Sequence, residues 1–277
     1  EAGGQYNGIP SRDPLPIPPS PFPDRDKETF SEAEMIQFKQ YKSAASRIHQ
    51  TNARNTSKRL QFMRTIQLAD RFKQYDAFYY PYQSDFRGRK YVTVSFLSPQ
   101  GTEYAKSLLQ FADGVALGDN HAVKWLAVHG ANCFGFDKAS LEDRELWAHM
   151  HTTQILAAAS DPMENLFWQE ADDPWMFLAF CYEWEGYCLH GVNHISHLPI
   201  GLDGSNNGLQ HFSAQLRDRV AGRATNLIPS DKPQDIYQEV ADKVNQQLKV
   251  AAAKGDQMAI QWLEFGVNRK CTKRPVM

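Results

Sequence analysis

The spacing of apolar residues along the chain changes several times, and each change predicts a different kind of element. From Thr29 to about Tyr75 the composition is helical, and Ser31 followed by Glu34 is the capping-box start of a helix. From Ala77 the chain becomes aromatic and β-branched, which predicts strands. Four polar side chains are expected to alternate onto one face of these strands: Arg87, Arg89, Tyr91 and Thr93.

The second half of the chain is predicted to be mostly helical. Trp and Phe residues recur from about residue 115 to 193, interrupted by a loop at 160–165, and a short strand is expected at 195–203. The last part repeats apolar side chains every four positions behind a predicted helix cap at Ser230 and Asp231. That apolar stripe consists of Ile236, Val240, Val244 and Leu248. The fold class indicated is α+β, mostly helical.

Composition narrows the classes of protein to consider. The chain has 277 residues, so two or more compact units are expected. Its net charge is −2, so the overall charge does not indicate a polyanionic partner. Residues 8–24 hold seven prolines, which predicts an extended linker. No apolar run reaches the roughly 18 residues of a membrane span, and the four cysteines form no CxxC pair, which favours a reducing cytoplasm. Because Glu1 opens the chain, we expect an internal piece of a longer protein.

The first candidate for chemistry is Asp203, which ends the predicted strand at 195–203. Its carboxylate and the Gly204 carbonyl are hard oxygen ligands of the kind that magnesium prefers. The Gly/Asn/Ser turn that follows would leave room for a ligand before a helix expected near Leu209. The alternative is that Asp203 only caps that helix. The opposite strand face is expected to pack on a core through Leu198, Ile200 and Leu202.

Basic residues gather at the C-terminal end of the sequence. Arg269 and Lys273 are four positions apart and would share a helix face, and Lys270 and Arg274 form a second such pair. Four cations within six residues are explained by a bound polyphosphate, although an exposed basic face is the simpler interpretation.

Two further basic segments suit a nucleic-acid backbone. In the segment SDFRGRKY, Arg87 and Arg89 would grip phosphates from a strand, or Asp85 and Arg89 would form a structural salt bridge. The helical segment before it carries a basic face that is usually just solvated but also suits phosphates. That face consists of Arg54, Lys58, Arg59 and Arg64.

A histidine cluster is rejected as a metal site. His190, His194 and His197, with Cys188 nearby, superficially resemble zinc ligands. The last two histidines lie where the strand is expected to begin, so helical spacing no longer brings the side chains together.

Taken in order, these segments resemble the single-subunit, bacteriophage-type DNA-directed RNA polymerases. DGSNNGLQHFSAQLRD (203–218) is similar to that family's motif A, SDFRGRKY (84–91) to its DxxGR motif, and RKCTKRPVM (269–277) to the start of its motif B. The likeness runs from about residue 30 to the end of the sequence. The segment 221–237 resembles phage enzymes more closely than mitochondrial or chloroplast ones.

The resemblance implies the right-hand architecture of polymerases, divided into six segments. They are 1–28, a proline-rich linker; 29–76, thumb-like helices; 77–115, palm strands with the DxxGR motif; 116–193, a helical palm insertion; 194–219, palm motif A; and 220–277, the start of the fingers.

The resemblance also implies roles for individual residues. Asp203 would bind both catalytic magnesium ions, with the Gly204 carbonyl as a further ligand. Lys273 would be catalytic as well as nucleotide-binding. The residues expected to bind the incoming NTP are Arg269, Lys273, Arg274, Tyr237 and Lys138. Those expected at the nucleic acid are Asp85, Arg87 and Arg89, with Arg89 on the template strand.

Several positions depart from the family pattern. Pro275 falls inside the motif-B helix and should kink it, and Asn206 and Asn207 replace other small residues in the turn after Asp203. The sequence ends before the motif-B tyrosine and before motif C, which carries the second metal-binding aspartate. By itself the chain is therefore expected not to polymerise nucleotides.

The function that the resemblance implies is template-dependent transfer of ribonucleotides from NTPs to an RNA 3′ end by a two-metal mechanism. The setting would be transcription of phage genes in the cytoplasm of an infected bacterium. The expected partners are a DNA template, nascent RNA and NTPs, with no membrane, and the enzyme would be a monomer. Two alternatives stay open: a non-catalytic nucleic-acid-binding module derived from a polymerase, and a family A DNA polymerase.

Overall fold

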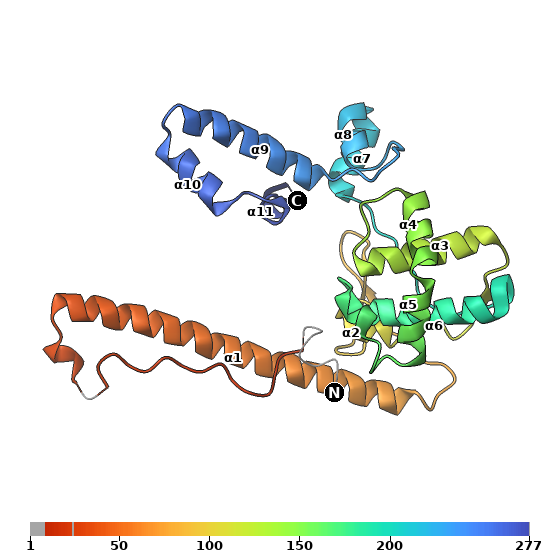
Figure 1. Ribbon diagram of the computed structural model, residues 1–277, viewed down its shortest axis with the longest axis horizontal. Coiled ribbons are helices and arrows are strands. Elements are labelled where there is room, and N and C mark those ends of the chain that lie inside the picture. Colours follow the sequence, from red (N-terminus) through yellow and green to blue (C-terminus); the bar gives the residue numbers. More distant parts are fainter. Residues whose placement is uncertain (1–8, 24, 277) are drawn as a thin grey trace. The chain divides into compact units, whose positions relative to one another are not determined.

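The computed structural model of the chain describes residues 9–23 and 25–276, except the side chains of residues 274–276. The chain divides into two compact units (Figure 1). Unit 1 comprises the residues up to Gly135 together with Trp147–Pro199, and unit 2 comprises Phe136–Leu146 together with the residues from Ile200 onward. Helices outnumber strands in the described residues, so the mostly helical α+β class is confirmed.

Unit 1 contains most of the elements, and one helix has residues in both units. In chain order the elements of unit 1 are the 3₁₀ helix η1 (Lys27–Thr29), α1 (Glu32–Phe72), β1 (Tyr82–Ser84), β2 (Lys90–Val92), α2 (Glu103–Ser107), β3 (Val115–Ala116), α3 (Asn120–Phe134), α5 (Thr152–Ser160), η2 (Leu166–Glu170), α6 (Pro174–His190), η3 (Gly191–Asn193) and β4 (Ile195–Ser196). Helix α4 (Leu141–Met150) crosses the sequence boundary between the units. None of the described helices is both long and apolar enough to pass through a membrane.

Helix α1 begins where its capping box predicts. The Ser31 hydroxyl accepts the Glu34 N–H (3.4 Å), and the Glu34 carboxylate accepts the Ser31 N–H (2.9 Å). Hydrogen bonds from the Arg25 side chain and from Ser31 lower the pKa of Glu34 to about 2, so the cap is ionised at neutral pH. The segment 29–76, expected to hold several helices, forms one long helix instead.

The proline-rich segment has no helix or strand within residues 9–23, as predicted. It is nevertheless attached to α1 at several points. Asn52 exchanges two hydrogen bonds with the Leu15 backbone (2.8 and 3.0 Å), and Arg59 donates to the Ser11 carbonyl (2.8 Å). The extended linker predicted from the proline content therefore runs along α1 and is hydrogen-bonded to it (Figure 1).

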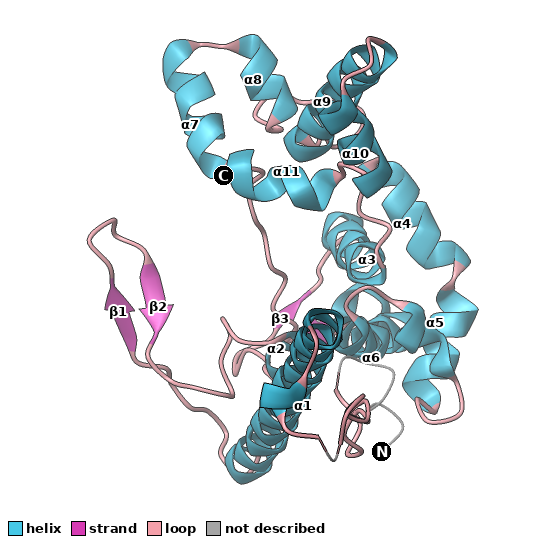
Figure 2. Cartoon of the chain, turned by 90° about the vertical axis from the view of Figure 1, so that its left-hand side faces the viewer, coloured by secondary structure: helices cyan, strands magenta, loops and turns pink. Residues whose placement is uncertain are grey.

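The predicted strands from Ala77 onward shorten to a small hairpin of β1 and β2 (Figure 2). Tyr82 pairs with Val92 and Ser84 with Lys90, so residues 85–89 form the turn. The prediction that Arg87 and Arg89 alternate on a strand face is wrong, because both belong to this turn. The physical reason is the Asp85 carboxylate, which accepts the N–H groups of both arginines (2.9 Å each) and so bends the chain.

The core of unit 1 forms where α3 and α5 pack against α6. Phe177, Phe180 and Trp184 of α6 are fully buried there. Gly130 of α3 permits the close approach, because a Cβ atom at this position would lie 2.3 Å from the Phe180 ring. The prediction of aromatic-anchored helices between residues 115 and 193 is confirmed, and so is the loop that follows Ser160.

The predicted strand at 195–203 is mostly absent. Only Ile195–Ser196 is a strand, paired with Val115–Ala116, and residues 197–204 have no regular structure. A strand needs a hydrogen-bonded neighbour, and within the described residues none pairs with 197–203. Of the three apolar residues expected in a core, Leu198 is buried, whereas Ile200 is partly exposed and Leu202 is 87% exposed.

Unit 2 contains the remaining helices of the described chain. They are α7 (Asn207–Leu216), α8 (Arg219–Ala224), α9 (Ile236–Ala253), α10 (Gln257–Phe265) and α11 (Arg269–Val276). Helices α10 and α11 both pack on α9 (Figure 1). Pro275 lies in the last turn of α11, where side chains are outside the described part of the structure.

The caps of α7 and α9 differ from the predicted ones. Helix α7 starts two residues before Leu209 and is capped by Asn206, so the interpretation of Asp203 as its cap is wrong. Helix α9 is capped by Asp235, not by Ser230 and Asp231. Here the side chain of Asn226 bonds the backbone of Gln234 in both directions (2.7 and 2.8 Å), which keeps the preceding residues in a loop.

Candidate functional site

Asp203 lies at an open cavity of about 340 Å³ within unit 2. Its Oδ1 accepts the Gly204 N–H (2.8 Å), and no described residue donates to Oδ2. Other lining residues are Ser205, Asp231 and Arg144, so the cavity holds two carboxylates and one guanidinium. The Asp203 side chain is exposed, which leaves one carboxylate oxygen accessible to a ligand.

Arg144 is the cation of this cavity and was not anticipated from the sequence. It is 7% exposed and donates from Nε to the Ala139 carbonyl (2.9 Å), and burial lowers the pKa of its guanidinium. Asp203 is far from it in sequence, and α4 carries no motif, so no local signal could have linked the two residues.

Asn226 connects the turn after Asp203 with the start of α9. Its backbone is left-handed (φ 59°), a conformation that Asn tolerates better than most residues. Its Nδ2 donates to the Ser205 hydroxyl (3.0 Å) as well as to the Gln234 carbonyl. The segment that holds Asp203 and the helix that holds Tyr237 are thus attached to each other through one side chain.

The structure brings two of the predicted nucleotide-binding residues, Arg269 and Tyr237, into contact. The Arg269 guanidinium lies 5.4 Å from the centre of the Tyr237 ring, in cation–π geometry. Arg269 also forms an ion pair with Asp235. Burial acts to raise the pKa of Asp235, but hydrogen bonds from Arg269 and from the backbone outweigh it and hold the pKa below its ordinary value.

The other predicted nucleotide-binding residues are not held by contacts of this kind. Lys273 is exposed on α11, and no described residue is its partner. The side chain of Arg274 lies outside the described residues. Lys138 forms an exposed ion pair with the neighbouring Asp137 and does not line the Asp203 cavity.

The residues of the DxxGR segment lie in unit 1, at the tip of the hairpin. Asp85 pairs with the Arg87 guanidinium (3.1 Å), so the expected Asp85–Arg89 salt bridge is wrong: Arg89 bonds Asp85 through its backbone N–H and carbonyl. Burial acts to raise the pKa of Asp85, but hydrogen bonds from Arg89 and Arg87 outweigh it and lower the pKa. In the described residues the Arg89 guanidinium has no acceptor, which leaves it open to an external anion.

Some basic side chains on this face of α1 contact other described residues of unit 1, and others do not. Arg59 donates to Ser11, and the Arg64 guanidinium lies 5.5 Å from the centre of the Phe96 ring. Arg54 and Lys58 are exposed. Arg64 is exposed as well, so three of the four side chains are accessible to an external anion.

The histidines of the rejected zinc site have structural partners within unit 1. His194 Nε2 bonds the Glu183 carboxylate (2.9 Å), and His197 Nδ1 bonds the Phe111 carbonyl (2.7 Å). Across the part of the chain that the structure describes, no three His, Cys, Asp or Glu side chains form a metal-binding group.

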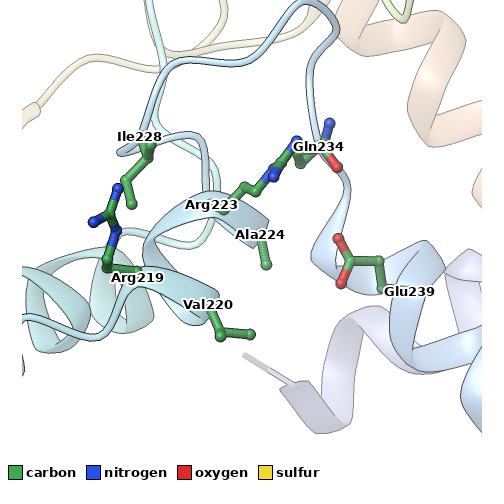
Figure 3. A pocket seen from close by; sticks show the side chains of 7 residues that line it. All are labelled: Arg219, Val220, Arg223, Ala224, Ile228, Gln234 and Glu239. Atoms are coloured by element: carbon green, nitrogen blue, oxygen red, sulfur yellow. The ribbon is translucent and has the colours of Figure 1, made fainter.

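A second cavity of unit 2, of about 360 Å³, lies beside α8 (Figure 3). Arg219 and Arg223 line it from successive turns of that helix, and Gln234 and Glu239 line it from the other side. Its charge is therefore mixed, with two cations and one carboxylate.

Comparison with known proteins decides the family. Residues 116–277 match the model of the DNA-dependent RNA polymerase family. The chain belongs to this family. The resemblance drawn from motif A and its neighbouring segments is thereby confirmed, and the match favours RNA polymerase over both alternatives.

Relatives of this polymerase chain occur in phages and in mitochondria. It is 39% identical to the DNA-directed RNA polymerase of Enterobacteria phage T3 over an alignment of 293 positions, which covers 97% of this chain and 32% of that protein. It is 40% identical to the enzyme of Enterobacteria phage K11, over 86% of this chain and 29% of that protein. Identity to the mitochondrial polymerase of Neurospora crassa is 34%, over 100% of this chain and 19% of that protein. The chain thus spans about a third or less of these relatives.

Proposed function

We propose that the protein carrying this sequence transfers ribonucleotides from NTPs to an RNA 3′ end under the direction of a DNA template. The observation that carries the proposal is the accessible carboxylate of Asp203, set at an open cavity within the region that matches the polymerase family. The phage relatives support the same setting, transcription of phage genes in the infected host by a single-subunit enzyme.

The residues at the cavity fit a magnesium ion. Asp203 offers a free Oδ2, and the Gly204 carbonyl would supply a second hard oxygen. Magnesium held there would lower the pKa of the attacking hydroxyl and neutralise charge on the leaving pyrophosphate. This chain would contribute Asp203 as a metal-binding carboxylate.

The cationic side chains of unit 2 would bind the triphosphate. As the RNA 3′ oxygen attacks the α-phosphate, negative charge grows on the phosphate oxygens and the bond to pyrophosphate breaks. Arg269 and Lys273 on α11 would stabilise that charge by charge-assisted hydrogen bonds, with Arg274 on the same helix. Lys138 would approach the phosphates after releasing Asp137.

The hairpin of unit 1 would hold the template. Arg89 has a free guanidinium beside a rigid turn, and the Asp85 carboxylate fixes that turn by accepting two backbone N–H groups. A phosphate contact from Arg89 would position the strand without reading its sequence. In this proposal α1 belongs to a thumb, the hairpin and the residues around Asp203 belong to a palm, and α9 to α11 begin the fingers of a right-hand architecture.

The test is Asp203→Asn in the full-length natural protein that contains this sequence. An amide cannot replace an ionised metal ligand, so nucleotide addition should fall by about a thousandfold or more while DNA affinity stays within about twofold. Primer extension with all four NTPs, beside a DNA-binding titration, measures both quantities. The matched comparison is Asp231→Asn, which removes a charge from the same cavity and should cost less than tenfold. Extension by Asp203→Asn at the rate of the unaltered protein would contradict the proposal.

A further inference from the structure

The carboxylate of Asp235 has two different partners, one on each oxygen. Oδ1 accepts the backbone N–H groups of Tyr237 (3.1 Å) and Gln238 (3.3 Å), which caps α9. Oδ2 accepts the Nε–H of Arg269, 34 residues later in the sequence. A single side chain therefore fixes the start of one helix and the first side chain of another.

This contact uses only one edge of the Arg269 guanidinium. The two terminal amino groups, Nη1 and Nη2, have no acceptor among the described residues, and the side chain is 42% exposed. The Tyr237 ring lies against the guanidinium, and Tyr237 itself is buried and held by the Thr272 hydroxyl, which donates to its carbonyl (2.7 Å). Arg269 is thus restrained at its Nε edge and at one face, with its outer donors free.

The ion pair is not a requirement of helix capping. Asp256 caps α10 in the same way, since its Oδ1 accepts the N–H groups of Met258 (2.9 Å) and Ala259 (3.2 Å). No described cation bonds its second oxygen. The ion pair of Asp235 with Arg269 is therefore not needed to cap α9.

A carboxylate beside Arg269 also reduces the positive potential that would attract a triphosphate. If the only purpose of Arg269 were to attract an anion, an acidic partner would be a disadvantage. The arrangement makes sense when orientation matters more than charge, because a long side chain held in one direction loses little freedom when it binds.

We infer that Asp235 is a positioning residue, which holds Arg269 over Tyr237 so that Nη1 and Nη2 point toward the phosphates of the incoming nucleotide. The inference rests on the proposed function and assigns a second residue to the same site. It predicts that the loss of Asp235 disturbs the geometry of the reaction more than the binding of the nucleotide.

The test is Asp235→Asn in the full-length natural protein that contains this sequence. Asn is as good a helix cap as Asp, so α9 keeps its start while Arg269 loses its ionic partner. We expect kcat for nucleotide addition to fall about tenfold or more while KM for NTP changes by less than about threefold. Asp235→Ser, a second cap-preserving change, should behave alike and guards against a folding defect peculiar to Asn.

Two further variants separate positioning from structure. Asp256→Asn makes the same change in a cap without a cation and should leave kcat and KM unaltered. The double variant Asp235→Asn/Arg269→Ala should be no worse than Arg269→Ala alone, because Asp235 acts only through Arg269.

The outcomes distinguish this inference from the proposed function. If Asp235→Asn matches the unaltered protein in kcat, or if its loss adds to that of Arg269→Ala, the positioning role is overturned. The proposed function then still stands, provided that Asp203→Asn is inactive. If the unaltered protein adds no nucleotides, the proposed function fails and this inference fails with it.

Discussion

Unit 1 and unit 2 differ in how their residues are held in place. Unit 1 encloses large side chains, with Phe177, Phe180 and Trp184 of α6 fully buried. Among the described residues of unit 2, Trp262 is 48% exposed and Phe265 is 68% exposed. Its buried apolar side chains in the described residues are mostly small, namely Ala224, Ala241 and Ala259 beside Tyr237.

Directional polar contacts take the place of a large core in unit 2. Four of its helices start at an Asn or Asp cap, at Asn206, Asp218, Asp235 and Asp256. Each such contact contributes about 1 kcal/mol, whereas a fully buried aromatic side chain contributes about 3–5 kcal/mol. The candidate site thus lies in the unit whose contacts are individually weak. Segments that move during function are commonly found in such parts of proteins.

The largest effect should come from the core of unit 1. Trp184→Ala removes a fully buried ring and its hydrogen bond from Nε1 to the Thr152 hydroxyl (3.1 Å). We expect a loss of about 3–5 kcal/mol in the unfolding free energy of unit 1, against less than about 1.5 kcal/mol in unit 2 for Trp262→Ala. Hydrogen exchange of the 277-residue chain, resolved by peptide, measures each unit separately. Equal losses would show that the two units do not differ in this way.

Acid should destabilise unit 1 before unit 2. Burial lowers the pKa of His129 on α3 from 6.5 to about 4, so the unfolded chain binds this proton more tightly than the folded one. Stability is therefore complete above pH 6.5 and falls toward pH 4, by up to about 3 kcal/mol. The Asp235 carboxylate of unit 2, whose pKa is lowered, contributes stability that is lost only below its ordinary value of 3.8.

Two carboxyl groups of unit 1 work against this trend. Burial raises the pKa of Glu103 and of Asp173, so protonation of either carboxyl favours the folded state as the pH falls through its raised pKa toward the ordinary value of 4.5 or 3.8. Comparison of unfolding at pH 7, 6 and 5 between the unaltered chain and His129→Gln isolates the histidine, because the variant keeps both carboxyls. His129→Gln should flatten the dependence, and an unchanged slope in that variant would exclude His129 as the cause.

A smaller effect is expected where Asn226 connects two segments of unit 2. Asn226→Ala loses the bonds to Ser205 and Gln234 and places Ala at a positive φ, which should cost about 1–2 kcal/mol. Asn226→Gly is the matched control, because Gly accepts that backbone conformation without strain but still lacks the hydrogen bonds. Faster hydrogen exchange at residues 203–209 in both variants would assign the effect to the hydrogen bonds. Faster exchange in Asn226→Ala alone would assign it to strain.

Local signals made the helices of the chain predictable. Ser31 and Glu34 are three residues apart and each bonds the other's backbone, so the start of α1 was visible in the sequence. The strand expected at 195–203 failed because its pairing depends on distant residues, which an alternating pattern does not reveal. The cap of α9 was misplaced because Ser230, Asp231 and Asp235 all precede the same apolar stripe, and the bonds of Asn226 decide between them.

The candidate site was predictable as a set of residues but not as an arrangement. The motifs singled out Asp203, Arg269 and Tyr237, and the structure sets the last two against each other. Asp235 and Arg144 carried no signal, because an acid before a helix looks like any cap and a buried arginine looks like any surface arginine. Their importance follows from tertiary contacts, which one sequence does not show.

The smallest effect is expected at the hairpin, which belongs to unit 1 but not to its core. The Asp85–Arg87 ion pair is exposed, so solvent and salt screen it. Arg87→Ala should leave the midpoint of thermal unfolding unchanged, and the N–H of Arg89 should stay protected from exchange because its acceptor, Asp85, is intact.

Asp85→Ala removes the acceptor of both turn N–H groups and should abolish that protection, again with little effect on the α6 core. Nuclear magnetic resonance of the two amides measures the difference. If Arg87→Ala lowered the midpoint as Trp184→Ala does, exposed charge pairs would stabilise unit 1 as much as its enclosed aromatic side chains, and the contrast between the units would be wrong.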